Sequence, residues 1–166
     1  MREPLKDKVR LKHIVEAIDN VLRYTDGKSF DDMTTDDMMC YAVVYNIMSI
    51  GEAAYHLTKA FREEHSETEW AGIMKMRNVL AHDYYKIKIQ IVWEVVKHDL
   101  LPLRKQVLRY IEETNWEEWE RNEVAIVETA IHKNLVQSAI RMKADGIEPN
   151  QIMRYTGLSI EEIDAL

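Results

Sequence analysis

Apolar residues recur every three or four positions along most of the chain, which is the spacing of helices that bury one face. In the first two thirds of the sequence this pattern predicts four helices, with apolar stripes over residues 11–22, 40–61, 70–81 and 92–111. Strand-like alternation is confined to a few residues around Ile89, and Pro102 is expected to kink or divide the fourth helix. We therefore predict an all-α fold, an antiparallel four-helix bundle over residues 1–114.

The remaining residues, 115–166, are expected to form a separate helical extension. Their pattern predicts one helix to about Lys143, a short helix over residues 149–155 and a last helix that begins at Ser159, with Glu162 completing a capping box. A Thr-Gly turn between the two short helices gives the outline of a helix-turn-helix unit. Because the last helix is short and acidic, it would repel DNA phosphates, so we expect a protein-contact or packing role and no DNA binding.

Composition adds few restrictions. Apolar residues make up 46% of the 166 residues and charged residues 31%, the balance of an ordinary globular protein, and the chain is long enough to bury a core without disulfides or metal. The single cysteine, Cys40, excludes an internal disulfide and a cysteine zinc site. The absence of a signal-like apolar start and of an apolar run of about 20 residues predicts a cytoplasmic protein without a membrane partner.

Charge is distributed unevenly. The net charge of −7 argues against a protein that coats nucleic acid nonspecifically. Between Lys75 and Arg109, however, eight basic residues stand against three acidic ones. A local cationic site of this kind suits a structured RNA or an acidic partner, although solvated helix faces are the commoner meaning of such a run.

Reactive side chains concentrate at residues 77–85, which read Arg-Asn-Val-Leu-Ala-His-Asp-Tyr-Tyr. On a helical wheel Arg77 lies in the middle of the apolar stripe of its own helix, where a permanent charge requires a carboxylate partner or an open cleft. A buried salt bridge with Glu52 on the preceding helix is the structural alternative to a functional role. His82 falls about 140° from Arg77, so either the helix ends near Ala81 or the two groups meet through a second copy of the chain.

The arrangement of Arg77, Asn78, His82 and Tyr84 resembles the Arg-x4-His-x-Tyr signature of HEPN proteins, specifically the HepT toxin branch. The flanking sequence is similar as well, and the resemblance covers about residues 5–113. The similar flanking positions are Ile50 to Ala54, Trp70, Met76 and Ile91 to Trp93.

This resemblance implies a homodimeric or larger all-α assembly that cleaves RNA, a tRNA or an mRNA, without metal or cofactor, in a cleft between two copies. His82 would act as general acid and base, Arg77 would stabilise charge on the phosphoryl oxygens, and Asn78 would orient these groups. Further residues are expected to bind RNA by stacking or by attracting its backbone. They are Lys75, Tyr85, Lys86 and Lys88.

The resemblance also implies a partner, a nucleotidyltransferase antitoxin of the MntA kind, in a type VII-like toxin–antitoxin pair. That partner would silence the toxin by transferring AMP to Tyr84, although the adjacent Tyr85 offers a second phenol. The alternative is a non-catalytic HEPN module that binds nucleotide or scaffolds the nucleotidyltransferase. The segment after Trp116 departs from the short HepT pattern and resembles tails of some transposase-like nucleases.

Overall fold

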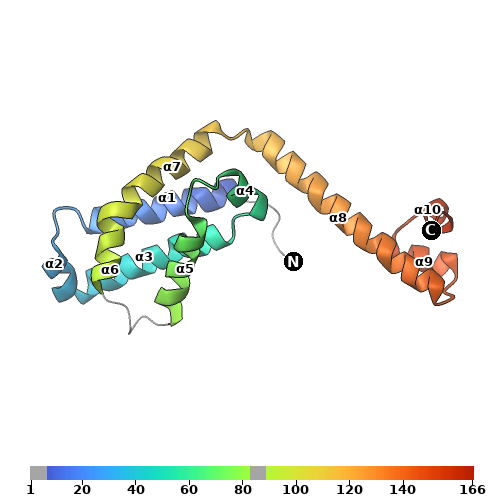
Figure 1. Ribbon diagram of the computed structural model, residues 1–166, viewed down its shortest axis with the longest axis horizontal. Helices are drawn as coiled ribbons and strands as arrows, with labels where there is room; N and C mark the ends of the chain where they lie inside the picture. The colour runs from blue at the N-terminus through green and yellow to red at the C-terminus, as the bar shows by residue number, and fades with distance from the viewer. Residues whose placement is uncertain (1–6, 83–88) are drawn as a thin grey trace. The chain divides into compact units, whose positions relative to one another are not determined.

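The computed structural model describes residues 7–82 and 89–166, except for the side chains of His82 and Glu123 (Figure 1). Every regular element in these ranges is helical, which confirms the all-α prediction. The helices are α1 (Asp7–Tyr24), α2 (Phe30–Thr35), α3 (Asp37–Tyr55), α4 (Lys59–Glu64), α5 (Trp70–His82), α6 (Ile89–Glu94), α7 (Leu100–Glu113), α8 (Trp116–Ala144), α9 (Pro149–Thr156) and α10 (Ile160–Asp164). The chain divides into two compact units, Met1–Asn115 and Trp116–Leu166.

Helices α1 and α3 form the central antiparallel pair of the first unit. Asn20, near the end of α1, donates a hydrogen bond to Asn46 of α3 at 3.3 Å, and Asp7, at the start of α1, accepts two from Thr58 beyond the end of α3. The apolar stripes predicted from the sequence meet between these helices and are almost fully buried. They include Leu11, Ile14, Ile18 and Val21 of α1 and Val43, Ile47, Ile50 and Ala54 of α3.

Two short helices depart from the prediction. The sequence pattern predicted no helix at residues 31–35, but they belong to α2, which begins with a capping box between Ser29 and Asp32. The second predicted helix was expected to continue through Phe61, and this is wrong: α3 ends at Tyr55 and α4 begins after Thr58. The Asp7 carboxylate accepts from the backbone N–H of Thr58 at 2.8 Å and from its hydroxyl at 2.7 Å, which holds the chain in an extended conformation there.

The fourth predicted helix is divided, although not at Pro102 itself. A π-helical turn, Val95–Asp99, separates α6 from α7, and the Leu100 N–H bonds to the Val95 carbonyl five residues back. Proline has no N–H, and its ring crowds the carbonyl four residues before it, here that of His98. The irregular turn therefore lies just before Pro102, where the regular hydrogen-bond ladder is interrupted.

The second unit packs two short helices against the end of α8. Ala139, Ile152, Leu158 and Ile163 form its buried core. Gly157 ends α9 with φ of 74°, a conformation that favours glycine, and Ser159 begins α10 with the predicted capping box to Glu162. The predicted helix-turn-helix outline is thus confirmed. None of the described helices combines the length and apolar character needed to cross a membrane.

Candidate functional site

The site around Arg77 depends on an unusually close approach of α5 to α3. At Gly51 of α3, an added Cβ would lie 2.3 Å from the Arg77 Cβ and 3.1 Å from the Ile73 carbonyl oxygen. Only a residue without a side chain fits there. The contact fixes the Arg77 backbone against the last turns of α3.

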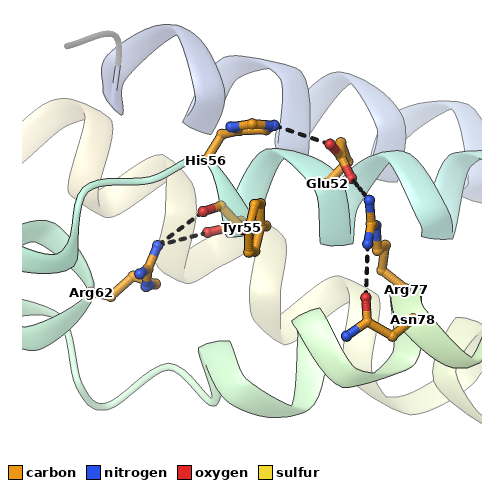
Figure 2. Close-up of polar contacts among 7 residues, drawn as sticks. Glu52, Tyr55, His56, Arg62, Arg77 and Asn78 are labelled. Atoms are coloured by element: carbon orange, nitrogen blue, oxygen red, sulfur yellow. Dashed lines mark hydrogen bonds and ion pairs between the residues drawn. The ribbon is translucent and has the colours of Figure 1, made fainter. Parts of the chain in front are cut away.

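Arg77 is held on two sides (Figure 2). Its Nη2 lies 2.6 Å from the Glu52 Oε2, and its Nη1 donates to the Asn78 Oδ1 at 2.8 Å. The guanidinium also lies 5.9 Å from the centre of the Tyr55 ring, within cation–π range. The pair with Glu52 was the expected structural alternative, but it is not enclosed in a core, because the Arg77 side chain is 31% exposed and that of Glu52 45%.

Glu52 connects Arg77 to a histidine, His56, that the sequence pattern did not single out. The Glu52 Oε1 lies 3.0 Å from the His56 Nε2, one helical turn further along α3 (Figure 2). Burial raises the pKa of Glu52, but hydrogen bonds from Arg77 and His56, and their positive charge, outweigh it and leave that pKa below its ordinary value. The carboxylate therefore stays ionised between its two partners. The spacing Glu-x3-His was the signal that could have identified His56.

A polar groove lies along α1 and α3 beside this network. Its volume is about 340 Å³. The lining residues are Arg10, His13, Glu16, Ala17 and Asn20 of α1, Tyr45, Asn46, Ser49, Glu52 and Ala53 of α3, and His56 just after it. Glu52 belongs to both features, so it connects the groove to the ion pair with Arg77.

Large apolar and aromatic side chains are exposed along α3. Met38, Tyr41, Tyr45 and Tyr55 are between 59% and 83% exposed. Together with Met48 and Glu52 they recur at alternating intervals of three and four residues, the spacing of a helix seam. Contiguous exposed apolar surface of this kind marks interaction sites in soluble proteins.

The structure describes only some of the other predicted site residues. Lys75 is exposed on α5, but two residues before Arg77 it lies about 160° away around the helix. His82 ends α5, and its side chain is not described. Tyr84, Tyr85, Lys86 and Lys88 lie outside the described residues. Across residues 7–82 and 89–166, no three His, Cys, Asp or Glu side chains gather where they could hold a metal ion.

A family model described as Ribonuclease HepT-like matches residues 14–111, more than half of the sequence. The chain belongs to this HepT-like family. The match contains α3, Arg77 and both residues that hydrogen-bond to it, so the Arg77 network lies within the matched range, whereas Arg10 and His13 of the groove precede it. The matched range ends within α7 and does not include α8, α9 or α10.

Curated relatives of this HepT-like chain carry ribonuclease names. "Putative RNase TTE0752" of Caldanaerobacter subterraneus is 36% identical over 97 residues, covering 58% of this chain and 87% of that protein. "Probable ribonuclease HepT" of Thermococcus cleftensis is 31% identical over 94 residues, covering 57% and 86%.

A longer relative is "Gamma-glutamylcyclotransferase and putative RNase MJ0434" of Methanocaldococcus jannaschii. It is 36% identical over 106 residues, covering 64% of this chain but only 48% of its own length, so the chain spans about half of that protein. No solved structure matches the chain.

Proposed function

We propose that this HepT-like chain is an RNA endonuclease and the toxin of a toxin–antitoxin pair, with Arg77, Asn78 and His82 as its catalytic residues. The main support for the proposal is that the Arg77 guanidinium is held in place and yet remains partly exposed. Its guanidinium is oriented by Glu52 at 2.6 Å and by Asn78 at 2.8 Å, yet about a third of the side chain is exposed. A guanidinium has five N–H donors, so these two hydrogen bonds leave it donors for a phosphate.

The proposed reaction is attack by a ribose 2′-oxygen on the adjacent phosphorus. The 2′-hydroxyl proton passes to a general base as the 2′-O–P bond forms, and the P–O5′ bond breaks as a general acid protonates the leaving oxygen. The products are a 2′,3′-cyclic phosphate and a 5′-hydroxyl, with no oxidant or co-reactant. His82 serves in this proton transfer, since an imidazole titrates near neutral pH. Arg77 stabilises the charge that develops on the phosphoryl oxygens, and no metal is required.

The proposal includes a homodimer with the site in the cleft between two copies. The exposed Met38, Tyr41 and Tyr55 of this stripe support it, because a single chain leaves these side chains in water. Glu52 and Tyr55 belong to that stripe and contact Arg77. A second copy on this face would exclude water from the arginine and strengthen its interaction with a phosphate. Tyr85, Lys75, Lys86 and Lys88 are proposed to contact the RNA, a tRNA or an mRNA.

Regulation by an MntA-like nucleotidyltransferase antitoxin completes the proposal. Transfer of AMP from ATP to the phenolic oxygen of Tyr84, with release of pyrophosphate and of the phenolic proton, would place a phosphodiester within reach of the segment that carries Arg77 and His82. Its negative charge and bulk would occupy the position of the substrate phosphate. The ribonuclease names of the relatives support RNA as the substrate of this site.

Purified full-length protein, incubated with total RNA in EDTA, tests the proposed activity. We expect fragments that end in a 2′,3′-cyclic phosphate and begin with a 5′-hydroxyl, and we expect none from His82→Ala protein of unchanged circular dichroism. Strict dependence on magnesium, or fragments with 5′-phosphates, would contradict this mechanism.

A further inference from the structure

The groove between α1 and α3 has two chemically different ends. Because the two helices are antiparallel, Arg10 and His13, one turn apart on α1, lie toward His56. The other end of the groove is formed by Asn20, Asn46 and Tyr45. One end therefore carries cationic or titratable nitrogen groups, and the other carries amides and an aromatic ring.

Arg10 is the strongest sign that the groove binds a ligand. Within the described part of the first unit its guanidinium has neither an ion pair nor a side-chain hydrogen bond, whereas Arg77, Arg104 and Arg109 of the same unit each pair with a carboxylate. Two carboxylates, those of Glu16 and Glu52, also line the groove. Glu52 is already engaged by Arg77 and His56. A planar guanidinium left open in a groove favours a phosphate, which it can bind through two N–H donors.

The amide end is ordered by a chain of hydrogen bonds. Arg23 donates to the Asn20 Oδ1 at 2.8 Å, the Asn20 Nδ2 donates to the Asn46 Oδ1 at 3.3 Å, and the Asn46 Nδ2 donates to the Ala42 carbonyl at 2.7 Å. These bonds fix which way each amide faces and leave further donor and acceptor capacity on Asn20. Tyr45, 69% exposed, offers a ring on which a base can stack.

We propose that this groove binds the RNA nucleotide next to the phosphate held by Arg77. The neighbouring phosphate lies between Arg10 and His13, and the base lies at Asn20 and Asn46 with its face on Tyr45. The ten residues from Arg10 to Asn20 span about 15 Å of helix, enough for one nucleotide and its phosphate. The volume of about 340 Å³ falls in the range of small-ligand sites. This inference rests on the proposed function, since it assigns the Arg77 site an RNA substrate.

Binding is tested apart from cleavage with full-length protein and a short, fluorescein-labelled 2′-O-methyl oligoribonucleotide of mixed sequence, which lacks the attacking hydroxyl. By fluorescence anisotropy we expect Arg10→Gln to weaken binding about three- to tenfold and to lower the slope of log affinity against log salt by about 0.7, the effect of one lost phosphate contact on a single strand. Tyr45→Ala should weaken binding about fivefold or more, the loss of one stacked base.

Matched controls decide the result. Lys105→Gln removes the same charge from the exposed surface of α7, outside the groove lining, and Tyr155→Ala removes an exposed tyrosine from the second unit; both should bind as the wild type does. Equal losses in the groove variants and their controls would overturn the inference. So would Arg10→Gln protein that keeps its RNA affinity but changes molar mass in light scattering, because the groove would then be a protein interface.

Cleavage separates this inference from the proposed function. If Arg77→Ala abolishes cutting while Arg10→Gln and Tyr45→Ala bind the probe normally, the groove assignment fails and the nuclease stands. If the groove variants lose binding but the wild type cuts no RNA, the groove assignment stands and the nuclease fails.

Discussion

Gly51 and Arg77 lie so close together that the structure has no room for a methyl group between them. A Cβ on Gly51 would meet the Arg77 Cβ at 2.3 Å and its Cγ at 3.1 Å. Both atoms belong to the base of the arginine side chain, so the strain cannot be relieved by moving its far end. The position of the guanidinium is therefore set by the backbone of the facing helix.

Gly51→Ala should push α5 away from α3 and displace Arg77. We expect a loss of about 1–3 kcal/mol in the free energy of unfolding, typical of overpacking, together with reduced RNA cleavage. Gly72→Ala is the matched control on α5, where the new Cβ would meet only the Glu69 Cβ at 3.9 Å. Because that position is helical and exposed, Gly72→Ala should stabilise the protein by about 0.5–1 kcal/mol. Urea denaturation measures both, and a Gly51→Ala protein as stable as its control would contradict the close approach.

Glu52→Gln removes the charge that orients Arg77. The pKa of Glu52 is lowered in the folded chain, so its contribution to stability is complete above the ordinary carboxyl pKa and is lost as the pH falls through the lowered value. At pH 7 we expect the variant to be less stable by about 0.5–1 kcal/mol, since the pair is partly exposed, and we expect the difference to shrink as the pH falls through the lowered pKa. Cleavage at pH 7 should fall by up to about a hundredfold because the arginine is no longer fixed. Stability curves with a constant difference from pH 7 to pH 3 would show that Glu52 does not act through its charge.

His65 gives the fold a separate dependence on pH. Its ring stacks on Tyr110 with centroids 4.1 Å apart, and its buried Nε2 has no hydrogen-bond partner in the described part of the chain. Burial lowers the pKa of His65, with opposing contributions from Glu67 and Glu64. The unfolded chain therefore binds a proton near pH 6.5 that the folded chain does not, so stability should fall as the pH drops from about 7 to 5. His65→Phe, which keeps the stacked ring, should flatten this part of the thermal-stability profile; parallel profiles would contradict it.

Tyr84 is the proposed site of modification. Co-expression with an MntA-like nucleotidyltransferase, or incubation with it and ATP, should add the mass of AMP to the peptide that contains Tyr84 and abolish cleavage. Tyr84→Phe should prevent the addition, whereas Tyr85→Phe should not. A label that persists in Tyr84→Phe protein and disappears in Tyr85→Phe protein would move the site by one residue.

Local patterns predicted the fold where local interactions determine it. Helical stripes located the main helices, and the Ser159–Glu162 capping box forms within one turn. The break after Tyr55 was not predictable in this way, because the carboxylate that holds Thr58 belongs to Asp7, 51 residues earlier. Likewise, the π-helical turn precedes the proline that interrupts the ladder instead of coinciding with it.

The candidate site was likewise predictable only where it depends on local sequence. The helical wheel predicted that Arg77 needs a carboxylate or a cleft, and the structure provides Glu52 in a half-exposed position. His56 was missed because its role depends on which way Glu52 turns, and the groove was missed because it requires two helices packed side by side. The roles of Asn78, His82 and Tyr84 in catalysis and regulation stay predictions.

Cleavage of RNA by Arg77→Ala protein, measured beside Arg109→Ala, tests the central claim most directly. Both arginines are partly exposed and pair with a glutamate, at 2.6 Å for Arg77 and 2.7 Å for Arg109, so the two variants lose similar surface interactions. The account predicts a loss of at least about a hundredfold in the cleavage rate for Arg77→Ala, as for other groups that stabilise transition-state charge, and a rate near that of the wild type for Arg109→Ala. Folded Arg77→Ala protein that cuts RNA as fast as Arg109→Ala would show that Arg77 serves the fold alone.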